Sequence, residues 1–506
     1  MWEIEVPLEA EPLGYKKLVS LFALGAVTHF RWSYASLKWE KREVHFNDQN
    51  MSLYIYPCSY RLSDDVFEHL EFALKHEGVN LYILKKVLES LSFGDLLKHI
   101  SKKQTGKYAR ILWYLYEKFT NKVLPLNDLL QGTFVPLLDP KEYYTGESKR
   151  SARHRIADNL LGTLDFAPMI RRSPRLRDAE KKDLGHVAHN LAKQYEPSVL
   201  ERAMRYLYTK ETMSSWEIEK EKPDNSRLVK FVGLLHKAAA IGPLSEKMLV
   251  GLQKDILDSR FTTDTYRDFQ NYVGEEPRMG QLILHYIPPK PEDVSFFMQH
   301  LIATFDLMEK VKINPVIATA VISFGFVYIH PFEDGNGRIH RFLIHYGLAR
   351  CKFIPEGFVF PVSAVILRDP KQYDKVLEAF SKSLLELVTN YKVSDMGELK
   401  VLQDSRDYYR YIDFTKVAEY LFDCVEKTIL TDFKEELSFL SDYDKIKKLC
   451  KEIIDMSDWR LDLFIRCVRQ NGGKLSQRKQ EAYFSMLTES EIKEMETIIQ
   501  KNFSLD

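Results

Sequence analysis

The chain has 506 residues, too many for one ordinary hydrophobic core, and this length predicts about two to four domains. Its 45% hydrophobic and 28% charged residues are typical of a folded globular protein and exclude a largely disordered chain. Lysine plus arginine and aspartate plus glutamate number 72 each, so no net charge would steer the whole molecule to nucleic acid or to an anionic membrane.

Cysteine usage and the start of the chain bear on the compartment. The five cysteines are scattered and include no CxxC pair, which predicts reduced thiols rather than a disulfide framework or a zinc site. The acidic start lacks the basic flank and apolar run of a signal peptide, so we expect a cytoplasmic protein. Residues 313–329 are uncharged and approach the ~20 residues of a spanning helix. Because Asn314 and Pro315 interrupt them and a charged turn follows, we expect a buried helix and no membrane span.

Residues 1–185 mix two kinds of pattern. Ser52–Tyr56 is predicted to be a strand, and residues 70–97 have the periodicity of amphipathic helix. The region carries no catalytic signature, and it ends in basic, turn-rich chain between Lys149 and Arg177. Such charge runs favour a solvated linker, with a local phosphate or nucleic-acid patch as the alternative.

Residues 186–393 are mostly helical in pattern. Ser245 is predicted to be the N-cap of a helix that begins at Glu246. Residues 266–289 are the exception, because glycines and prolines punctuate them and an apolar run ends them. This pattern predicts a β-hairpin.

Residues 394–506 are again helical and charged. A turn is predicted at residues 471–473, and residues 488–491 have the pattern of a capping box. The predicted fold class is therefore mainly α, with a helical core at 186–393 between a mixed N-terminal region at 1–185 and a helical C-terminal domain at 394–506.

The residues that carry chemistry are HPFEDGNGRIHR, at positions 330–341, followed by a helix predicted at 339–349. Gly335 and Gly337 would let the backbone approach a ligand closely and adopt positive φ, and the amides that follow open a helix N-terminus that attracts anions. Arg338 and Arg341 are three residues apart, so both can grip phosphates from one helix face.

Two further side chains in this segment suit nucleotide chemistry. Asp334 can hold Mg²⁺, which keeps most of its waters and bridges phosphates. His330 can accept a hydroxyl proton near neutral pH. The sequence therefore predicts a polyphosphate site with a general base beside it.

Other interpretations of the segment explain fewer of its residues. A calcium loop is disfavoured because the glycine and the distal glutamate of the EF-hand spacing are missing. His340 and His345 are five apart, which does not suit a zinc pair on one helix face. The chain has no GxxxxGK[ST] sequence, which excludes a P-loop. An ordinary turn with surface arginines remains the plain alternative.

The twelve residues resemble the motif HPFxDGNGRxxR of the Fic (filamentation induced by cAMP) family at every specified position. The likeness covers roughly 186–393 and includes residues 266–274, which resemble the flap of that family. By the resemblance, the hairpin at 266–289 lies over the motif and pairs with an extended stretch of a target protein. The alternative for the hairpin is a plain surface connection.

The resemblance implies a set of roles. His330 would deprotonate the target hydroxyl for attack on the α-phosphate of ATP, and pyrophosphate would leave. Arg338 after Gly337 separates the motif from the Doc branch, which has a lysine after its asparagine and phosphorylates its target. The remaining assignments are Mg²⁺ to Asp334, the α-phosphate to Asn336 with the amides of Gly335 and Gly337, and the β- and γ-phosphates to Arg338 and Arg341.

Two further stretches resemble parts of Fic proteins. Residues 369–373 resemble the stretch that forms the adenine pocket, which implies that Tyr373 binds the nucleotide, although Asp374 and Ser381 depart from the family pattern. Residues 211–221 resemble the inhibitory helix [S/T]xxxE[G/N] that some members carry before the core.

In that helix Ser215 and Glu219 supply the pattern, and Lys220 stands where the family has Gly or Asn. By the resemblance, Glu219 would pair with Arg341 and turn it away from the γ-phosphate. The alternative is an ordinary surface glutamate.

Together these residues predict an ATP- and Mg²⁺-dependent protein adenylyltransferase that is restrained in cis. An enzyme that removes AMP from a modified target, or does both, is the alternative on the same site. The alternative of another class is a non-catalytic, nucleotide-sensing interaction module. The expected partner is a target protein on the hairpin, and the flanking regions are the candidates for self-association and for nucleic-acid binding, which the balanced charge disfavours.

Overall fold

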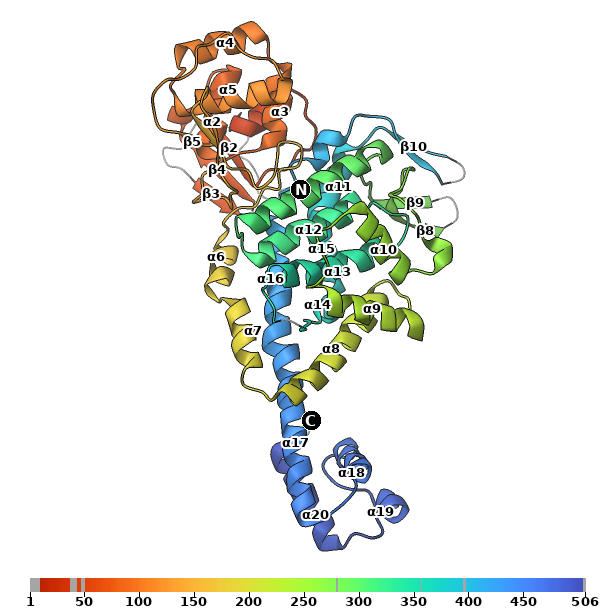
Figure 1. Ribbon diagram of the computed structural model, residues 1–506. Helices are drawn as coiled ribbons and strands as arrows, with labels where there is room; N and C mark the ends of the chain where they lie inside the picture. Colours follow the sequence, from red (N-terminus) through yellow and green to blue (C-terminus); the bar gives the residue numbers. More distant parts are fainter. Residues whose placement is uncertain are drawn as a thin grey trace. The chain divides into compact units, whose positions relative to one another are not determined.

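The structure is a computed structural model, whose helices and strands are drawn in Figure 1. The chain folds into two compact units. It describes residues 10–36, 43–46, 51–278, 281–355, 357–394 and 397–503. The first unit comprises Met1–Lys181, Ala240–Lys352 and Asp369–Phe422, and the second comprises Lys182–Ala239, Phe353–Arg368 and Asp423–Asp506. The three-segment division expected from the sequence stays a prediction. Residues 1–9, on which the export prediction depended, lie outside the described residues.

The first unit begins with a four-stranded sheet of order β1-β2-β4-β3. The predicted strand at Ser52–Tyr56 is confirmed as β4, which pairs parallel with β2 and antiparallel with β3. Its residues are mostly buried and β-branched or aromatic, which suits an inner strand. The other elements here are β1 (Glu11–Leu13), α1 (Gly14–Leu21), β2 (Arg31–Ala35), β3 (Glu43–Phe46), η1 (Cys58–Tyr60), α2 (Val66–His76), α3 (Leu81–Ser90), α4 (Phe93–Lys102) and α5 (Lys107–Thr120).

The helical stretch expected at 70–97 is broken into parts of three helices. Gly78 has a φ of 91° and lies just beyond α2. Asn80 then caps α3 by accepting a hydrogen bond from the Ile83 N–H, and Ser92 caps α4. The apolar spacing alone would predict one continuous helix, but the cap residues divide it into separate helices.

The basic chain between Lys149 and Arg177 is folded, so the solvated-linker interpretation is wrong for its central arginines. The segment holds β6 (Lys149–Ser151), β7 (Ile156–Asp158) and the start of α6 (Pro174–Lys181), and β7 pairs with the preceding strand β5 (Val135–Pro136). The Arg153 guanidinium bonds the Glu117 carboxylate and the Leu124 and Leu126 carbonyls. Arg155 donates to the Leu129 carbonyl at 2.9 Å. These side chains fasten loops to one another.

A layer of helices forms the middle of the first unit: α10 (Glu246–Ile256), α11 (Pro291–Lys310), α12 (Pro315–Ile329), α13 (Asn336–Arg350) and α15 (Pro370–Leu387). The uncharged stretch at 313–329 is confirmed as a buried helix, α12, which packs against α11 and α13 (Figure 1). A helix that is apolar all round is buried on every side. No helix in the described ranges combines the length and apolar content needed to cross a membrane.

Two small hairpins complete the first unit. The hairpin predicted at 266–289 is confirmed as β8 (Val273–Arg278) and β9 (Gln281–Tyr286), although residues 279–280 lie outside the described ranges. Gly274 is required in it, because a Cβ there would lie 2.6 Å from the Ile283 carbonyl oxygen. The second hairpin is β10 (Tyr391–Val393) with β11 (Leu399–Val401), and η2 (Ser259–Phe261), η3 (Arg406–Tyr409) and the start of α16 (Thr415–Lys427) are the remaining elements.

The second unit is helical in its described residues. The predicted turn at 471–473 separates α18 from α19, and the capping box of Thr488 and Glu491 is confirmed at the start of α20. Helix α8 packs against α9, α14 and α17. The elements are α7 (Leu184–Ala192), α8 (Pro197–Ile218), α9 (Asn225–Lys237), α14 (Val362–Arg368), a π-helical turn η4 (Thr428–Phe433), α17 (Lys434–Ile453), α18 (Asp458–Gln470), α19 (Gln477–Tyr483) and α20 (Glu489–Asn502).

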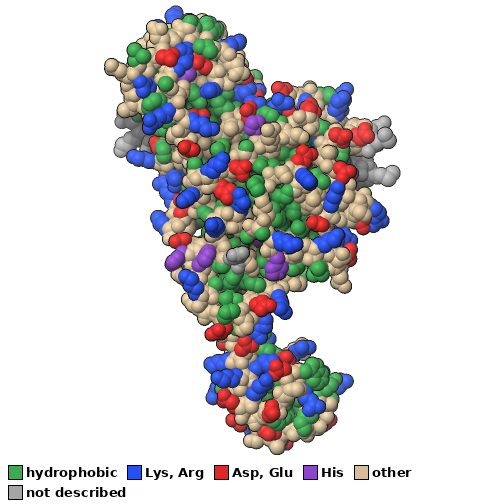
Figure 2. Space-filling view, in the orientation of Figure 1, with side chains coloured by type: hydrophobic (Ala, Val, Ile, Leu, Met, Phe, Trp, Pro, Cys, Tyr) green, Lys and Arg blue, Asp and Glu red, His purple; other side chains and the backbone are tan. Residues whose placement is uncertain are grey.

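Charged side chains of both signs are interspersed over the face shown in Figure 2. This distribution matches the equal numbers of acidic and basic residues in the chain. The mainly α fold class predicted from the sequence is confirmed.

Candidate active site

His330 lies at the turn that ends α12. Its backbone is left-handed, with φ 53° and ψ 59°, and its N–H donates to the Phe326 carbonyl at 2.9 Å. The ring Nδ1 lies 3.3 Å from the Val327 carbonyl oxygen. Because a carbonyl can only accept, a hydrogen bond here places a proton on Nδ1, and in the neutral ring Nε2 then carries the lone pair. The half-buried ring is therefore held in the tautomer that a general base needs.

The next turn joins α12 to α13 through Asp334 and Gly335. Gly335 is left-handed, with φ 85°, and its N–H donates to Asp334 Oδ1. A Cβ on Gly335 would meet the Leu257 side chain at 3.3 Å, so the backbone approaches α10 closely. The expectation of positive φ is confirmed for Gly335 and wrong for Gly337, which lies in the first helical turn of α13.

Asn336 braces the loop from inside. Its side chain is 3% exposed, Oδ1 accepts from the Phe332 N–H at 3.0 Å, and Nδ2 donates to the Phe332 carbonyl at 2.8 Å. Phe332 is fully buried, with its ring 5.5 Å from that of Tyr266. Asn336 therefore positions the loop, and its expected contact with the α-phosphate stays a prediction.

Arg338 and Arg341 lie on the inner side of α13, with exposed fractions of 2% and 1%. Arg338 Nη2 donates to Asp334 Oδ1 at 3.1 Å across one helical turn. Because a buried guanidinium is stable only near polar or anionic groups, two of them on successive turns are suited to an anionic ligand.

The Asp334 carboxylate fits the Mg²⁺ assigned to it. Its side chain is 49% exposed, and only Oδ1 is used in hydrogen bonds within the described chain. Within the same ranges, no three His, Cys, Asp or Glu side chains gather around one point. A single accessible carboxylate suits Mg²⁺, which takes most of its ligands from phosphates and water.

Tyr373, the expected nucleotide contact, belongs to α15 and is 7% exposed. Its ring lies 6.1 Å from that of His340 on α13, so it is close to the helix that carries both arginines. His340 Nδ1 lies 2.7 Å from the Ser323 carbonyl, which gives this histidine a structural bond.

Three residues with no role assigned from the sequence support the turn at residues 330–336. Gln253 of α10 donates to the Asp334 carbonyl at 3.2 Å, and Asn271 donates to the Phe332 carbonyl at 3.2 Å. Arg267 donates to the His330 carbonyl at 2.9 Å. Arg267 and Asn271 lie within the flap-like stretch at 266–274, but only the fold shows that their partners are backbone atoms of the motif.

The expected inhibitory residues belong to the second unit. Ser215 is fully buried within α8, and Glu219 is an exposed residue at its C-cap. The Lys220 N–H donates to the Glu217 carbonyl, and the Glu221 N–H donates to the Trp216 carbonyl. These two bonds form a Schellman motif with Lys220, at φ 58°, as its left-handed residue. The inhibitory pattern has Gly or Asn at this position, and both residues adopt the left-handed conformation more readily than others do.

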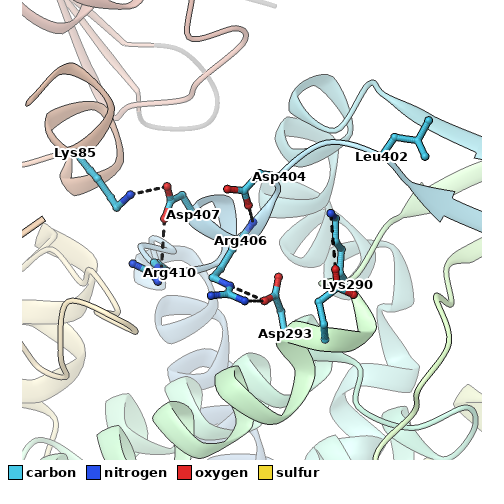
Figure 3. Close-up of a pocket in the computed structure, with 9 residues that line it drawn as sticks. Lys85, Lys290, Asp293, Leu402, Asp404, Arg406, Asp407 and Arg410 are labelled. Atoms are coloured by element: carbon cyan, nitrogen blue, oxygen red, sulfur yellow. Dashed lines mark hydrogen bonds and ion pairs between the residues drawn. The ribbon is translucent and has the colours of Figure 1, made fainter. Parts of the chain in front are cut away.

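A charged cavity of about 590 Å³ lies away from the motif, between α3, the start of α11 and η3 (Figure 3). Its cations pair with its own anions: Lys85 Nζ lies 2.7 Å from Asp407, and Arg406 bonds Asp293. The charges of this cavity are therefore neutralised in pairs. The motif offers a glycine turn followed by a helix N-terminus, an arrangement that suits phosphate, and it is the better candidate for the nucleotide site.

Comparison with known proteins agrees with this geometry. Residues 243–348 match the model of the Fic/DOC family, and this range includes α10, the β8–β9 hairpin and the whole motif. The chain therefore contains a Fic domain.

Several curated relatives are named "Protein adenylyltransferase Fic". The one from Aedes aegypti is 24% identical over 273 residues, which is 52% of this chain and 49% of that protein. The one from Drosophila mojavensis is 25% identical over 297 residues, which is 57% of this chain and 52% of that protein. The chain thus spans about half the length of these relatives. A solved Fic family protein from Desulfovibrio desulfuricans aligns with a TM-score of 0.38 and 16% identity, covering 65% of this chain and 89% of that one.

Proposed function

We propose that this protein is a protein adenylyltransferase, which transfers AMP from ATP to a hydroxyl side chain of a target protein. The observation that carries the proposal is the His330 turn: an imidazole fixed in the base tautomer beside a helix N-terminus that carries two buried arginines. The relatives named as adenylyltransferases support the same chemistry.

In the proposed reaction, Nε2 of His330 takes the proton of the target hydroxyl. The oxygen then forms a bond to the α-phosphorus of ATP, and the bond from that phosphorus to the bridging oxygen breaks, which releases pyrophosphate. Arg338 and Arg341 hold the β- and γ-phosphates, and the first amides of α13 face the α-phosphate. Mg²⁺, held by Asp334, would neutralise charge on the leaving pyrophosphate.

The target is proposed to dock on the β8–β9 hairpin. This hairpin is a sheet of two strands, so an extended segment can add to its edge. Val273 and Ile283 are 39% exposed and offer apolar contacts for the side chains of such a segment. Main-chain hydrogen bonds would supply affinity, and the exposed side chains would supply selectivity.

We further propose that Glu219 restrains the site in cis. The match of Ser215 and Glu219 to the inhibitory pattern supports the assignment of the glutamate.

The test is incorporation of labelled AMP by the full chain with Mg²⁺ and ATP. Glu219→Gly should increase self-modification over the parent chain, and adding His330→Asn to that variant should lower it by about 10²–10⁴-fold. Glu217→Gly, two residues earlier on the same exposed helix end, is the matched control and should change little. Equal incorporation of AMP by the parent and Glu219→Gly chains would reject the proposal that Glu219 restrains the site. Nucleotide binding by Glu219→Gly without any transfer would reject the enzyme assignment in favour of a sensing module.

A further inference from the structure

The guanidinium of Arg267 joins the two ends of the β8–β9 hairpin to the end of α12. Its Nη1 donates to the Phe269 carbonyl at 2.8 Å on the chain entering the hairpin. Its Nη2 donates to the Pro289 carbonyl at 2.6 Å on the chain leaving it. Its Nε donates to the His330 carbonyl at 2.9 Å. One planar group thus fixes three backbone segments.

The backbone of Arg267 adds to the same connection. Its N–H donates to the Pro331 carbonyl at 2.9 Å, so the residue contacts the catalytic turn through both its main chain and its side chain. Nη2 also lies 3.5 Å from the Ile329 carbonyl. The carbonyls of a helix C-terminus have no partner within the helix, and a cation there is stabilised by the helix dipole.

The environment of Arg267 indicates a positioning role rather than a binding one. The residue is 4% exposed, and within the described ranges it makes no ion pair with a carboxylate. Burial lowers its pKa to about 10, which still leaves the guanidinium charged at neutral pH. The four hydrogen bonds of its side chain described above all go to backbone carbonyls, and the planar fork of an arginine presents donors in these several directions.

Other side chains complete this base of the hairpin. Gln270 Nε2 donates to the Pro288 carbonyl at 3.0 Å, which closes the hairpin below its strands. The Tyr286 hydroxyl donates to the Tyr328 carbonyl at 2.5 Å, which connects the end of β9 to α12. These bonds hold the hairpin near α12, and among the hydrogen bonds described here those of Arg267 reach both hairpin ends and His330 together.

We propose that Arg267 is a positioning residue that holds the β8–β9 hairpin in register with His330, so that a hydroxyl presented by a target on the hairpin meets the imidazole. The inference rests on the proposed function, because it assigns docking to the hairpin and proton removal to His330. The new element is a physical link between the hairpin and His330. Misplacement of a reacting group by about 1 Å costs on the order of 10²-fold in rate, so a link of this kind controls turnover.

The test uses the full chain in the Glu219→Gly background. Arg267→Gln should lower transfer of labelled AMP on the order of 10²-fold, while affinity for a fluorescent ATP analogue changes by less than about twofold. Arg267→Lys should regain only part of the rate, because one ammonium cannot span three segments. Hydrogen exchange measured by mass spectrometry should rise together in residues 266–278 and 327–336.

Arg110→Gln is the matched control. Arg110 is 7% exposed and also donates to backbone carbonyls, those of Thr133 and Arg155, but it lies in the N-terminal part of the first unit. Arg110→Gln should leave AMP transfer and hydrogen exchange at the motif unchanged, while it lowers the global stability of the protein about as much as Arg267→Gln does. A variant that merely weakened the fold would reduce ATP binding and transfer in parallel.

Three results would overturn the link: unchanged transfer by Arg267→Gln, loss of ATP binding in proportion to loss of transfer, or faster exchange in only one of the two segments. If the Glu219→Gly parent itself transfers no AMP, the proposed function fails. The exchange measurement then still decides whether Arg267 holds the hairpin and the catalytic turn together.

Discussion

The side-chain amide of Asn336 bonds twice to the backbone of Phe332, as acceptor at 3.0 Å and as donor at 2.8 Å. Both bonds are buried, and each buried group left unsatisfied costs about 1–3 kcal/mol. Asn336→Asp replaces the donor with an oxygen that faces the Phe332 carbonyl. We expect transfer of AMP to fall by at least ~10²-fold, since the loop that carries the phosphate contacts would no longer be held.

The same substitution elsewhere separates this effect from a general loss of stability. Asn314 caps α12 by accepting a hydrogen bond from the Val316 N–H, a role that aspartate fills equally well. Asn314→Asp should therefore keep both the rate and the melting temperature. The bracing role of Asn336 would be wrong if the two variants were equally active.

The left-handed conformation of Lys220 predicts a substitution that tightens the proposed restraint. A non-glycine residue in the left-handed conformation destabilises the folded chain by ~1–2 kcal/mol, which glycine would recover. Glycine also gives the unfolded chain more conformational entropy, which offsets ~0.4–1 kcal/mol of that gain. Lys220→Gly should therefore stabilise the end of α8 and lower basal self-modification a few-fold. Thermal unfolding and AMP incorporation measured on the same preparation check both effects.

Lys222→Gly is the control for Lys220→Gly. Lys222 is also exposed but is not among the positive-φ residues, so glycine there gains no conformational relief. We expect slightly lower stability and unchanged self-modification. If Lys220→Gly raises self-modification instead, the end of α8 does not carry the restraint.

The elements that could be predicted from the sequence are those with strong local signals. Residues 313–329 contain no charge and have Asn-Pro at positions 314–315, so both the burial and the start of α12 follow from local chemistry. The capping box at Thr488 likewise fixes the start of α20. At 70–97, by contrast, apolar periodicity continues across two caps, and only the conformation of Gly78 and the side-chain bonds of Asn80 and Ser92 reveal three helices.

The candidate site likewise contains residues that the sequence could identify and residues that it could not. The motif itself is contiguous, so His330, Asp334 and both arginines could be selected from their spacing alone. The supporting bonds of Gln253 and Arg267 connect residues 81 and 63 positions apart, and their partners are backbone carbonyls, which leave no mark on the sequence. The α-phosphate contact of Asn336, implied by the resemblance, stays a prediction, and the structure adds two bonds from its amide to the backbone of Phe332. Long-range backbone contacts are therefore what sequence reasoning missed.

The backbone of His330 determines how its catalytic role should be tested. At φ 53°, alanine would add conformational strain to the loss of the imidazole, whereas asparagine tolerates the left-handed region. His330→Asn should lower transfer by about 10²–10⁴-fold, the usual contribution of a general base. Affinity for the ATP analogue should stay near that of the parent, because the proposed phosphate contacts belong to α13.

The pH dependence of the His330→Asn variant provides the second readout. In the parent, the rate should fall as acid protonates the imidazole, and the variant should lose that limb of the profile. Measurements of kcat/KM across neutral pH in the Glu219→Gly background check this. An acid limb that persists in His330→Asn would assign the base to another group.

Glu77 in the N-terminal part of the first unit predicts a pH dependence of stability. Its carboxyl group is fully buried, Oε2 accepts from the Tyr15 N–H at 2.7 Å, and burial raises its pKa from 4.5 to about 8. Because the folded-state pKa is the higher one, the proton stabilises the fold fully below pH 4.5. That stabilisation is lost as pH rises to about 8, by up to ~1.4 kcal/mol per pH unit.

Glu77→Gln keeps the size of the side chain and an acceptor for Tyr15 but cannot titrate. Hydrogen exchange in residues 66–80, corrected for the intrinsic rate at each pH, should reveal faster local opening of the parent at pH 8 than at pH 6. The variant should open at similar rates at both values, because no proton is released on unfolding at residue 77. Equal pH sensitivity in the two proteins would mean that Glu77 is ionised in the folded state, and that the Tyr15 amide stabilises a buried carboxylate rather than an acid.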